Sequence, residues 1–259
     1  MKAALSSTTL RTFTPDELVD AAARLGYEAV EIWSELLWES GVDPAALGRS
    51  ARERGLALSI HGPSRDLNVT SRNAGIRRES RAQYMRSLED AAGMEAGIVN
   101  LHPGALSSSH DRAEDFIPEM TEYAGELAEA TGRLGLRAAL ELMEARTGEY
   151  VTAIPAAAAI AREVNHPALG ITVDLAHLLY SGESTATKGF ESSIIHLHLS
   201  GSTRERVHVP LAEGVYDLRP PLLEIEKFFG GIAATESFAP GRALETSGEN
   251  LRAFERLLA

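Results

Sequence analysis

GITVDLAHLLYSG, residues 170–182, begins as a short β-branched apolar run and then places Asp174 and His177 three residues apart. The run is typical of a buried strand, and the residues after it are typical of a helix. The stretch therefore predicts a strand that passes directly into a helix, with a carboxylate and an imidazole at the junction. An unpaired carboxylate is costly to bury, so a strand of this kind indicates a functional site at its end.

The same pattern of strand followed by helix repeats along the chain. Short apolar runs alternate with longer helical patterns, and the strand candidates are KAALSS (2–7), AVEIW (29–33), LALSIHG (56–62), GIVNLHPG (97–104), RAALELM (137–143), LGITVDL (169–175), IIHLHLSG (194–201) and IAATESF (232–238). Such alternation predicts an α/β protein with a parallel sheet inside a layer of helices, and eight repeats predict closure into a single (β/α)8 barrel. A doubly wound open sheet is the alternative, but no GxGxxG follows the first strand.

The segment TPDELVDAAARLG (14–26) carries the clearest helix signals. Thr14 is placed to cap the helix, Pro15 to begin it and Glu17 to complete a capping box, while Gly26 follows its end. Other segments have apolar or small residues at helical spacing, namely 77–94, 115–135 and the alanine-rich 156–161.

Composition excludes several classes of function. Lys and Arg number 25 against 37 Asp and Glu, and the formal charge of −12 disfavours nucleic acid as a partner. The chain of 259 residues has no cysteine, so disulfides, cysteine-based zinc sites and thiol nucleophiles are excluded. The first ten residues lack the apolar core of a signal peptide, and no apolar run reaches about 18 residues. We therefore expect a soluble, cytoplasmic protein that does not use a membrane.

The third to eighth strand candidates each end on a residue type that binds metals. These residues are His61, His102, Glu141, Asp174, His198 and Glu236. The carboxyl ends of barrel strands converge on one face, where barrel active sites are built, so we expect the six side chains to meet there. Carboxylate and imidazole without thiolate suit Zn, Mn, Fe, Co or Mg, and a bound cation would compensate the buried acids.

Each of these residues also has an ordinary interpretation. A histidine at a strand end is often a packed core residue, Asp174 could cap the following helix, and His177 could face solvent one turn later. His196 lies on the same side of its strand as His198 because side chains alternate with a period of two. We favour His198 as the ligand, since it lies nearer the strand's end.

The residues lie in segments that resemble the xylose isomerase-like TIM barrel superfamily, which includes endonuclease IV and the sugar phosphate isomerases and epimerases. The resemblance implies one domain of this type over residues 1–259. Its motifs occur in order, as SIHGPSRDLNVTS (59–71), VNLHPG (99–104), ALELME (139–144), VDLAHLLYSG (173–182), HLHLSGS (196–202), HVPLAEG (208–214) and TESF (235–238). Any one motif is weak, whereas seven in order at fitting spacing are strong.

The resemblance to the single-metal isomerases and epimerases implies a ligand set for one divalent ion, which would be Mn, Co, Zn or Mg. The implied ligands are Glu141, Asp174, His198 and Glu236. Glu141 and Glu236 are further implied to be catalytic, moving a proton of a keto-sugar or sugar phosphate through a metal-stabilised enediolate, as in an EC 5-type isomerase. The residues implied to contact the substrate are His61, Asn68, His102, His177 and His208.

Departures from the superfamily pattern separate its branches. Trinuclear nucleases of this type also have an Asp two residues before the loop histidine, and Arg206 occupies that position here. A guanidinium should weaken a third metal site and suits an anion or a sugar oxygen, which makes Arg206 a candidate for substrate binding. Trp33 is another, since its ring could cover a sugar face, although ordinary packing explains it equally well. Other departures leave the exact substrate open; they are Gly201, Leu142 and Ala212, where the pattern has Asp, Asn and Gly.

Three functions stay open at this point. The favoured one is a metal-dependent isomerase or epimerase that acts on a small sugar or sugar-like molecule. The second is a metal-dependent lyase or dehydratase on a sugar- or cyclitol-like substrate, which needs the same enolate chemistry. The third is an endonuclease IV-like AP endonuclease with multinuclear zinc, which Arg206 and the negative charge oppose. A homo-oligomer is compatible with the sequence, which leaves the oligomeric state open.

Overall fold

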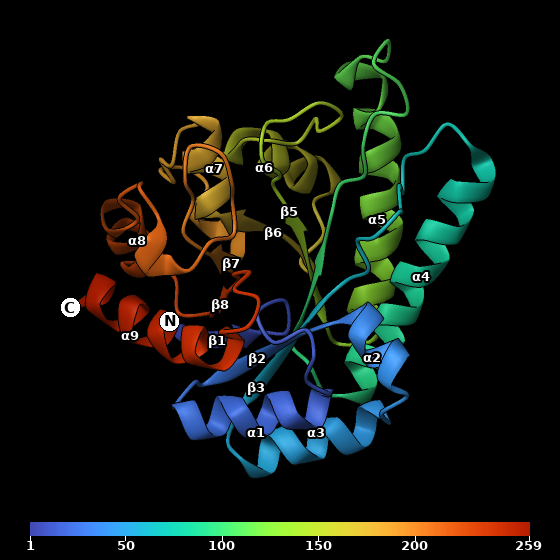
Figure 1. Cartoon of the computed structure of the whole chain (residues 1–259). Coiled ribbons are helices and arrows are strands. Elements are labelled where there is room, and N and C mark those ends of the chain that lie inside the picture. The colour runs from blue at the N-terminus through green and yellow to red at the C-terminus, as the bar shows by residue number, and fades with distance from the viewer.

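The computed structural model describes residues 1–259 and contains a closed barrel of eight parallel strands (Figure 1). The strands are β1 (Lys2–Ser6), β2 (Ala29–Trp33), β3 (Ala57–His61), β4 (Ile98–Leu101), β5 (Arg137–Glu141), β6 (Leu169–Asp174), β7 (Ile194–Leu199) and β8 (Ile232–Thr235). Each strand pairs with the next, and β8 pairs with β1 to close the barrel. The predicted (β/α)8 barrel is therefore confirmed, and the open sheet is excluded.

Helices cover the outside of the barrel (Figure 1). They are α1 (Pro15–Leu25), α2 (Ser34–Ser40), α3 (Pro44–Glu53), α4 (Ala74–Gly93), α5 (Ile117–Arg133), α6 (Ile154–Val164), α7 (Leu175–Ser181), α8 (Arg219–Glu226) and α9 (Ala243–Leu258). Three short 3-10 turns lie between them, η1 (Ala113–Asp115), η2 (Glu191–Ser193) and η3 (Leu211–Glu213). The connection from β2 to β3 holds two helices, and the additional one, α2, begins directly at the end of β2.

Local signals place α1 as the sequence predicts. The Thr14 side chain accepts a hydrogen bond from the backbone of Glu17, and the Glu17 side chain bonds back to the Thr14 backbone. Gly26 ends the helix in the left-handed conformation, with φ of 94°. All four free N–H groups at a helix start need partners, and this capping box supplies two of them. None of the helices has the length and hydropathy that crossing a membrane requires.

The inside of the barrel changes character along its axis. Side chains at alternate strand positions point inward. Small and apolar residues, including Ala4, Ala29 and Ala234, fill one part of the interior. The buried residues closer to the carboxyl ends are polar, namely Glu31, Ser59, Asn100, Thr172 and His196. A polar interior of this kind has to satisfy its own hydrogen bonds, and it supports the residues at the mouth of the barrel.

Candidate metal centre and active site

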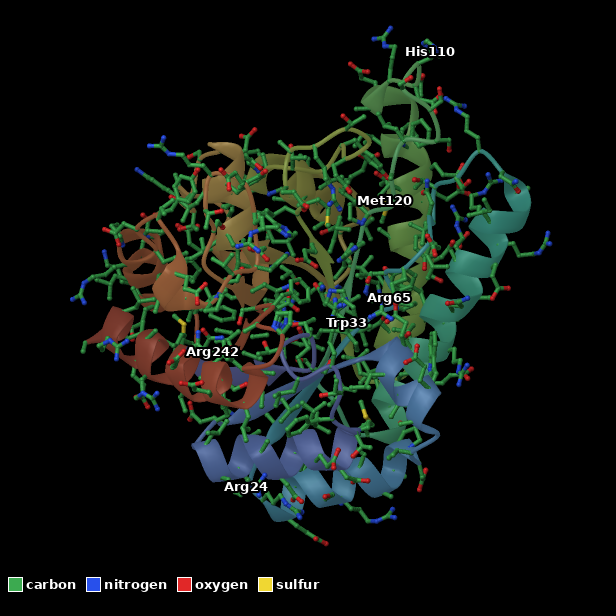
Figure 2. All side chains as sticks on the ribbon, viewed as in Figure 1. Arg24, Trp33, Arg65, His110, Met120 and Arg242 are labelled. Atoms are coloured by element: carbon green, nitrogen blue, oxygen red, sulfur yellow. The ribbon has the colours of Figure 1, made fainter.

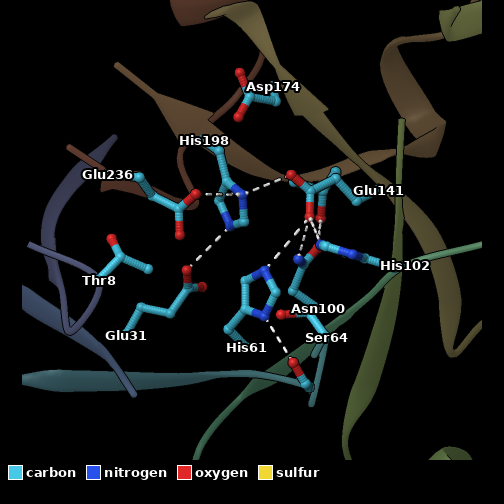
Figure 3. Close-up of polar contacts among 12 residues, drawn as sticks. Thr8, Glu31, His61, Ser64, Asn100, His102, Glu141, Asp174, His198 and Glu236 are labelled. Atoms are coloured by element: carbon cyan, nitrogen blue, oxygen red, sulfur yellow. Dashed lines mark hydrogen bonds and ion pairs between the residues drawn. The ribbon is translucent and has the colours of Figure 1, made fainter. Parts of the chain in front are cut away.

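The carboxyl ends of the last four strands bring three carboxylates and one imidazole together (Figure 3). Glu141 and Asp174 are the last residues of β5 and β6, His198 lies one residue before the end of β7, and Glu236 directly follows β8. All four are buried, with 5% exposure or less. These four residues are far apart in the sequence, and they lie together in the barrel as the strand pattern predicts.

His198 lies at the centre of the group. Its Nδ1 is 2.9 Å from Oε1 of Glu141 and 3.5 Å from Oε2 of Glu236. Ligand atoms of Glu141, Asp174 and His198 all lie within 4.8 Å of one another, as do those of His61, His198 and Glu236. Nδ1 is therefore the nitrogen of His198 that faces the carboxylates at the mouth.

Asp174 uses its two oxygens differently. Oδ1 accepts a hydrogen bond of 2.9 Å from the backbone N–H of His177 and so caps α7. Oδ2 is buried and has no hydrogen-bond partner. The capping interpretation is thus correct for one oxygen, while the other remains free to bind a cation. A buried carboxylate oxygen without a donor is rare and calls for such a partner.

Glu31 supports His198 from inside the barrel, a role that was not predicted from the sequence. Its Oε1 lies 3.0 Å from Nε2 of His198, an ion-pair contact without hydrogen-bond geometry. Its Oε2 accepts a hydrogen bond of 2.9 Å from Ser59 and lies 2.6 Å from Nε2 of His196. His196 is therefore part of this network. The available signal was a fully buried acid inside the apolar run AVEIW (29–33).

Asn100 supports Glu141 in the same way. Its Nδ2 donates a hydrogen bond of 2.6 Å to Oε2 of Glu141, and its Oδ1 accepts one of 2.5 Å from Thr172. On the opposite side, Ser6 donates to Oε1 of Glu236 over 3.2 Å. Outer residues that orient metal ligands commonly make contacts of this kind. Asn100 and Ser6 were not predicted from the sequence, because an amide and a hydroxyl are not among the metal-binding residue types that mark the other strand ends.

Two pairs of histidines flank the four central residues. His61 and His102 approach Oε2 of Glu141 through Nε2, at 3.6 and 3.2 Å. On the other flank, the Nε2 atoms of His177 and His208 lie 3.1 Å apart. The interpretation of His177 as a solvent-facing residue is wrong, because the residue is 2% exposed. All four histidines predicted to line the mouth do lie there.

The buried charges shift one another's pKa values. Burial alone would raise the pKa of Glu141, but the charge of His198 and hydrogen bonds from the neighbouring histidines hold it well below its usual value. Burial alone would lower the pKa of His198, but the surrounding carboxylates raise it well above its usual value. Burial alone would also lower the pKa of His61, but contacts with the carboxylates raise it to about 9. Excess negative charge at the centre is thus the common cause.

The other residues predicted to contact substrate lie around the mouth. The Trp33 ring packs 5.0 Å from the His61 ring, centroid to centroid. Arg206 is exposed in the loop after β7, and its backbone N–H bonds Thr203. Asn68 joins two loops, with Nδ2 donating to Ala105 and Oδ1 accepting from the Thr70 and Ala105 backbones. A substrate contact for any of the three stays a prediction.

The donor set fits a divalent cation. Three buried carboxylates and one imidazole offer hard and borderline ligand atoms, and no thiolate is present. Oδ2 of Asp174 accepts no hydrogen bond, and Glu31 lies against the far nitrogen of His198 as outer residues do at metal centres. Glu141, Asp174, His198 and Glu236 are the residues that would hold the ion.

Comparison with known proteins gives one family and several relatives. The family described as xylose isomerase-like TIM barrel matches residues 19–257. Over 197 residues, 72% of this chain, the sequence is 23% identical to D-psicose 3-epimerase of Agrobacterium fabrum, of which it covers 67%. Over 182 residues it is 26% identical to 3-dehydroshikimate dehydratase of Pseudomonas putida, of which it covers 27%. That enzyme is thus much longer than the matched part.

Solved structures agree on the fold. The IolI protein, whose crystal structure contains a bound zinc atom, aligns with a TM-score of 0.84 over 100% of this chain and 98% of its own. The sequence identity of that pair is 17%, so the likeness is evidence of the shared barrel alone.

Proposed function

The chain belongs to the xylose isomerase-like TIM barrel family, and on that premise we propose that it is a divalent-metal-dependent epimerase or isomerase of a keto-sugar or sugar phosphate. One observation carries the proposal: Glu141 and Glu236 approach Nδ1 of His198 from its two sides (Figure 3). A substrate bound between these carboxylates would have one on each face. The similarity to D-psicose 3-epimerase supports the same class of reaction.

The reaction needs a proton to leave a carbon next to a carbonyl group. A divalent ion held by Glu141, Asp174, His198 and Glu236 would polarise that carbonyl and make the neighbouring C–H more acidic. In the metal-free site the neighbouring histidines hold the pKa of Glu141 well below its usual value, so its carboxylate is ionised near neutral pH. Removal by one carboxylate and return from the other inverts the carbon, which is epimerisation. Return at the adjacent carbon by a single carboxylate is isomerisation.

The histidines would hold the substrate in position for this transfer. His102 is part-exposed at the mouth, with 27% of its side chain accessible, while its Nε2 contacts Glu141. His61, His177 and His208 offer further ring nitrogens around the same opening. Hydrogen bonds from these rings to hydroxyl groups would fix the reacting carbon near the two carboxylates.

Deuterium incorporation from solvent tests this proposal. The metal-loaded protein is incubated with ketoses and ketose phosphates in D₂O, and exchange at the carbons beside the carbonyl is followed by NMR. We expect exchange in the native protein and a loss of about 100-fold or more in Glu141→Gln and Glu236→Gln. Glu28→Gln, an exposed position at the start of β2, is the control. Unchanged exchange in both site variants would refute the assignment of the two carboxylates.

A dehydratase is the second candidate, because the sequence is also similar to 3-dehydroshikimate dehydratase. Both reactions begin with removal of a proton beside a carbonyl, and they differ in whether a hydroxyl group then leaves. The two activities are distinguished by incubating the protein with 3-dehydroshikimate and measuring the ultraviolet absorbance of the aromatic product that forms when water is lost. Product formation without ketose exchange would favour the dehydratase.

An endonuclease IV-like activity is the third candidate, and the flanking histidines are the observation behind it. Ligand atoms of His61, His102 and Glu141 lie within 4.8 Å of one another, and so do those of Asp174, His177 and His208. Elemental analysis decides between one ion and several. About one ion per chain supports the epimerase, whereas two or three zinc ions with cleavage of abasic DNA would support the nuclease.

A further inference from the structure

Two arginines from different loops share one aromatic ring at the mouth of the barrel. The guanidinium carbon of Arg11, in the loop after β1, lies 5.7 Å from the centroid of the Trp33 ring. That of Arg65, in the loop after β3, lies 5.5 Å from the same centroid. Figure 2 shows Arg65 beside Trp33 at the centre of the view. Cation–π contacts hold both guanidinium groups in place.

A second ring extends this arrangement toward the candidate metal centre. Arg11 also lies over Phe238, with its guanidinium carbon 4.3 Å from the ring centroid. Phe238 is 39% exposed and follows Glu236 by two residues. Its ring packs 5.8 Å from the His208 ring. The two arginines therefore lie on the same rim as the residues of the site.

The positive charges of Arg11 and Arg65 lack partners. Neither side chain forms an ion pair, whereas Arg72, Arg81 and Arg146 each pair with acids. Burial lowers the pKa of Arg11, and the charge of Arg65 lowers it further. Two cations held close together without an ion-paired acid repel each other, and an anion bound to both would reduce that repulsion.

The acids nearest to this pair form no ion pair with it. Glu35 and Glu39 line the same small cavity as Arg11, Arg65 and Trp33. Oε1 of Glu35 accepts hydrogen bonds from the backbone of Ser64 and Arg65, at 2.8 and 3.2 Å, so it fixes the loop that carries Arg65. Its Oε2 is buried without a partner, and neither oxygen contacts a guanidinium group.

The distance to the reacting centre is short. The Trp33 ring, on which both arginines lie, packs 5.0 Å from the His61 ring. Nε2 of His61 is in turn 3.6 Å from Glu141. One aromatic ring therefore separates the two guanidinium groups from a histidine that contacts the proposed proton acceptor.

We propose that Arg11 and Arg65 bind an acidic group, a carboxylate or a phosphate, at the far end of the substrate. This inference rests on the proposed function and narrows it from keto-sugars in general to those that carry an anion. Planar guanidinium groups with several N–H donors match the oxygens of carboxylates and phosphates. The sequence had suggested Arg206 for such a contact. All three arginines are exposed on loops, but only Arg11 and Arg65 lie over Trp33 at the mouth.

Three ketoses that differ at one end test the inference. D-fructose, D-fructose 6-phosphate and D-fructuronate are compared as substrates for deuterium exchange by the metal-loaded protein. We expect the KM for an acidic ketose to be at least about tenfold lower than that for D-fructose. In Arg11→Gln and Arg65→Gln, the KM for the acidic ketose should rise about tenfold with little change in kcat. Phosphate and carboxylate are distinguished by which acidic ketose is preferred. A preference for D-fructose, or unchanged KM in both variants, would overturn the inference.

A binding measurement separates this inference from the proposed function. Inorganic phosphate and acetate are titrated into the metal-free protein by calorimetry. We expect at least one to bind, and Arg11→Gln or Arg65→Gln to weaken it about tenfold. Arg24→Gln, on α1 and far from the mouth in Figure 2, is the control. If anion binding requires both arginines but no ketose exchanges deuterium, the proposed function is refuted and the anion site is supported. If neither anion binds, the anion site is refuted, even if neutral ketoses exchange deuterium with the solvent.

Discussion

Glu31 has the clearest single-residue role that the structure adds to the site. It is fully buried, and its carboxylate lies against Nε2 of His198 while Nδ1 faces Glu141. A carboxylate in this position fixes which imidazole nitrogen carries a proton and raises the basicity of the other. It therefore prepares His198 to bind an ion through Nδ1.

Replacing Glu31 by Gln should weaken metal binding without removing a ligand. We expect the dissociation constant for the divalent ion to rise about 10- to 100-fold, as is usual for outer residues of metal sites. Competition with a coloured chelator measures this constant. Glu28→Gln, exposed just before β2 and at the other end of the strand from the mouth, should leave it unchanged. Equal affinity in native protein and Glu31→Gln would show that Glu31 does not act on the metal centre.

The raised pKa values of His61 and His198 predict a pH dependence of the metal-free protein. A histidine whose pKa is higher in the folded than in the unfolded state stabilises the fold fully below about 6.5 and loses this contribution as pH rises. For His61 the loss should extend to about pH 9. We expect the free energy of unfolding of the metal-free protein to fall over this range. Urea denaturation at several pH values measures it, and a value that rises or stays constant would contradict the prediction.

At the scale of elements, local chemistry explains why the sequence predicted so much of the barrel. The eight strands and α1 carry their own signals, in apolar runs and in the capping residues Thr14 and Glu17. Helix α2 was not predicted, because its seven residues follow β2 without any helix-start signal beyond the strand. Glu31 and Asn100 were missed because their partners come from strands distant in sequence, which no local pattern reveals.

Two helical glycines predict opposite effects of the same substitution. A Cβ added at Gly48 in α3 would lie 2.4 Å from the backbone oxygen of Met94, whereas one at Gly125 in α5 would contact nothing within 4 Å. Gly48→Ala should therefore destabilise the fold by about 1–3 kcal/mol through overpacking. Gly125→Ala should stabilise it by about 0.5–1 kcal/mol, because alanine loses less backbone entropy. Chemical denaturation compares both, and a stable Gly48→Ala would disprove the close approach of α3 to the segment after α4.

At the scale of the whole molecule, the barrel concentrates acids where its strands end. Glu31, Glu141, Asp174 and Glu236 are all buried there, in a chain whose formal charge is already −12. These carboxylates raise the pKa of His198, so its protonated ring offsets part of their charge in the metal-free protein. A divalent ion offsets it more completely, so folding and metal binding should be coupled.

This coupling predicts that the ion stabilises the entire barrel. An ion at about 1,000 times its dissociation constant adds roughly 4 kcal/mol to the free energy of unfolding, which for a chain of this size raises Tm by about 8–16 °C. Differential scanning calorimetry with and without Mn²⁺ or Zn²⁺ measures the shift. Asp174→Asn should abolish most of it, because Oδ2 of Asp174 accepts no hydrogen bond and the substitution removes a negative charge from the proposed ligand set. Asp16→Asn, in the first turn of α1, is the control and should retain the shift. An equal shift in native protein and Asp174→Asn would place the stabilising ion elsewhere on the molecule.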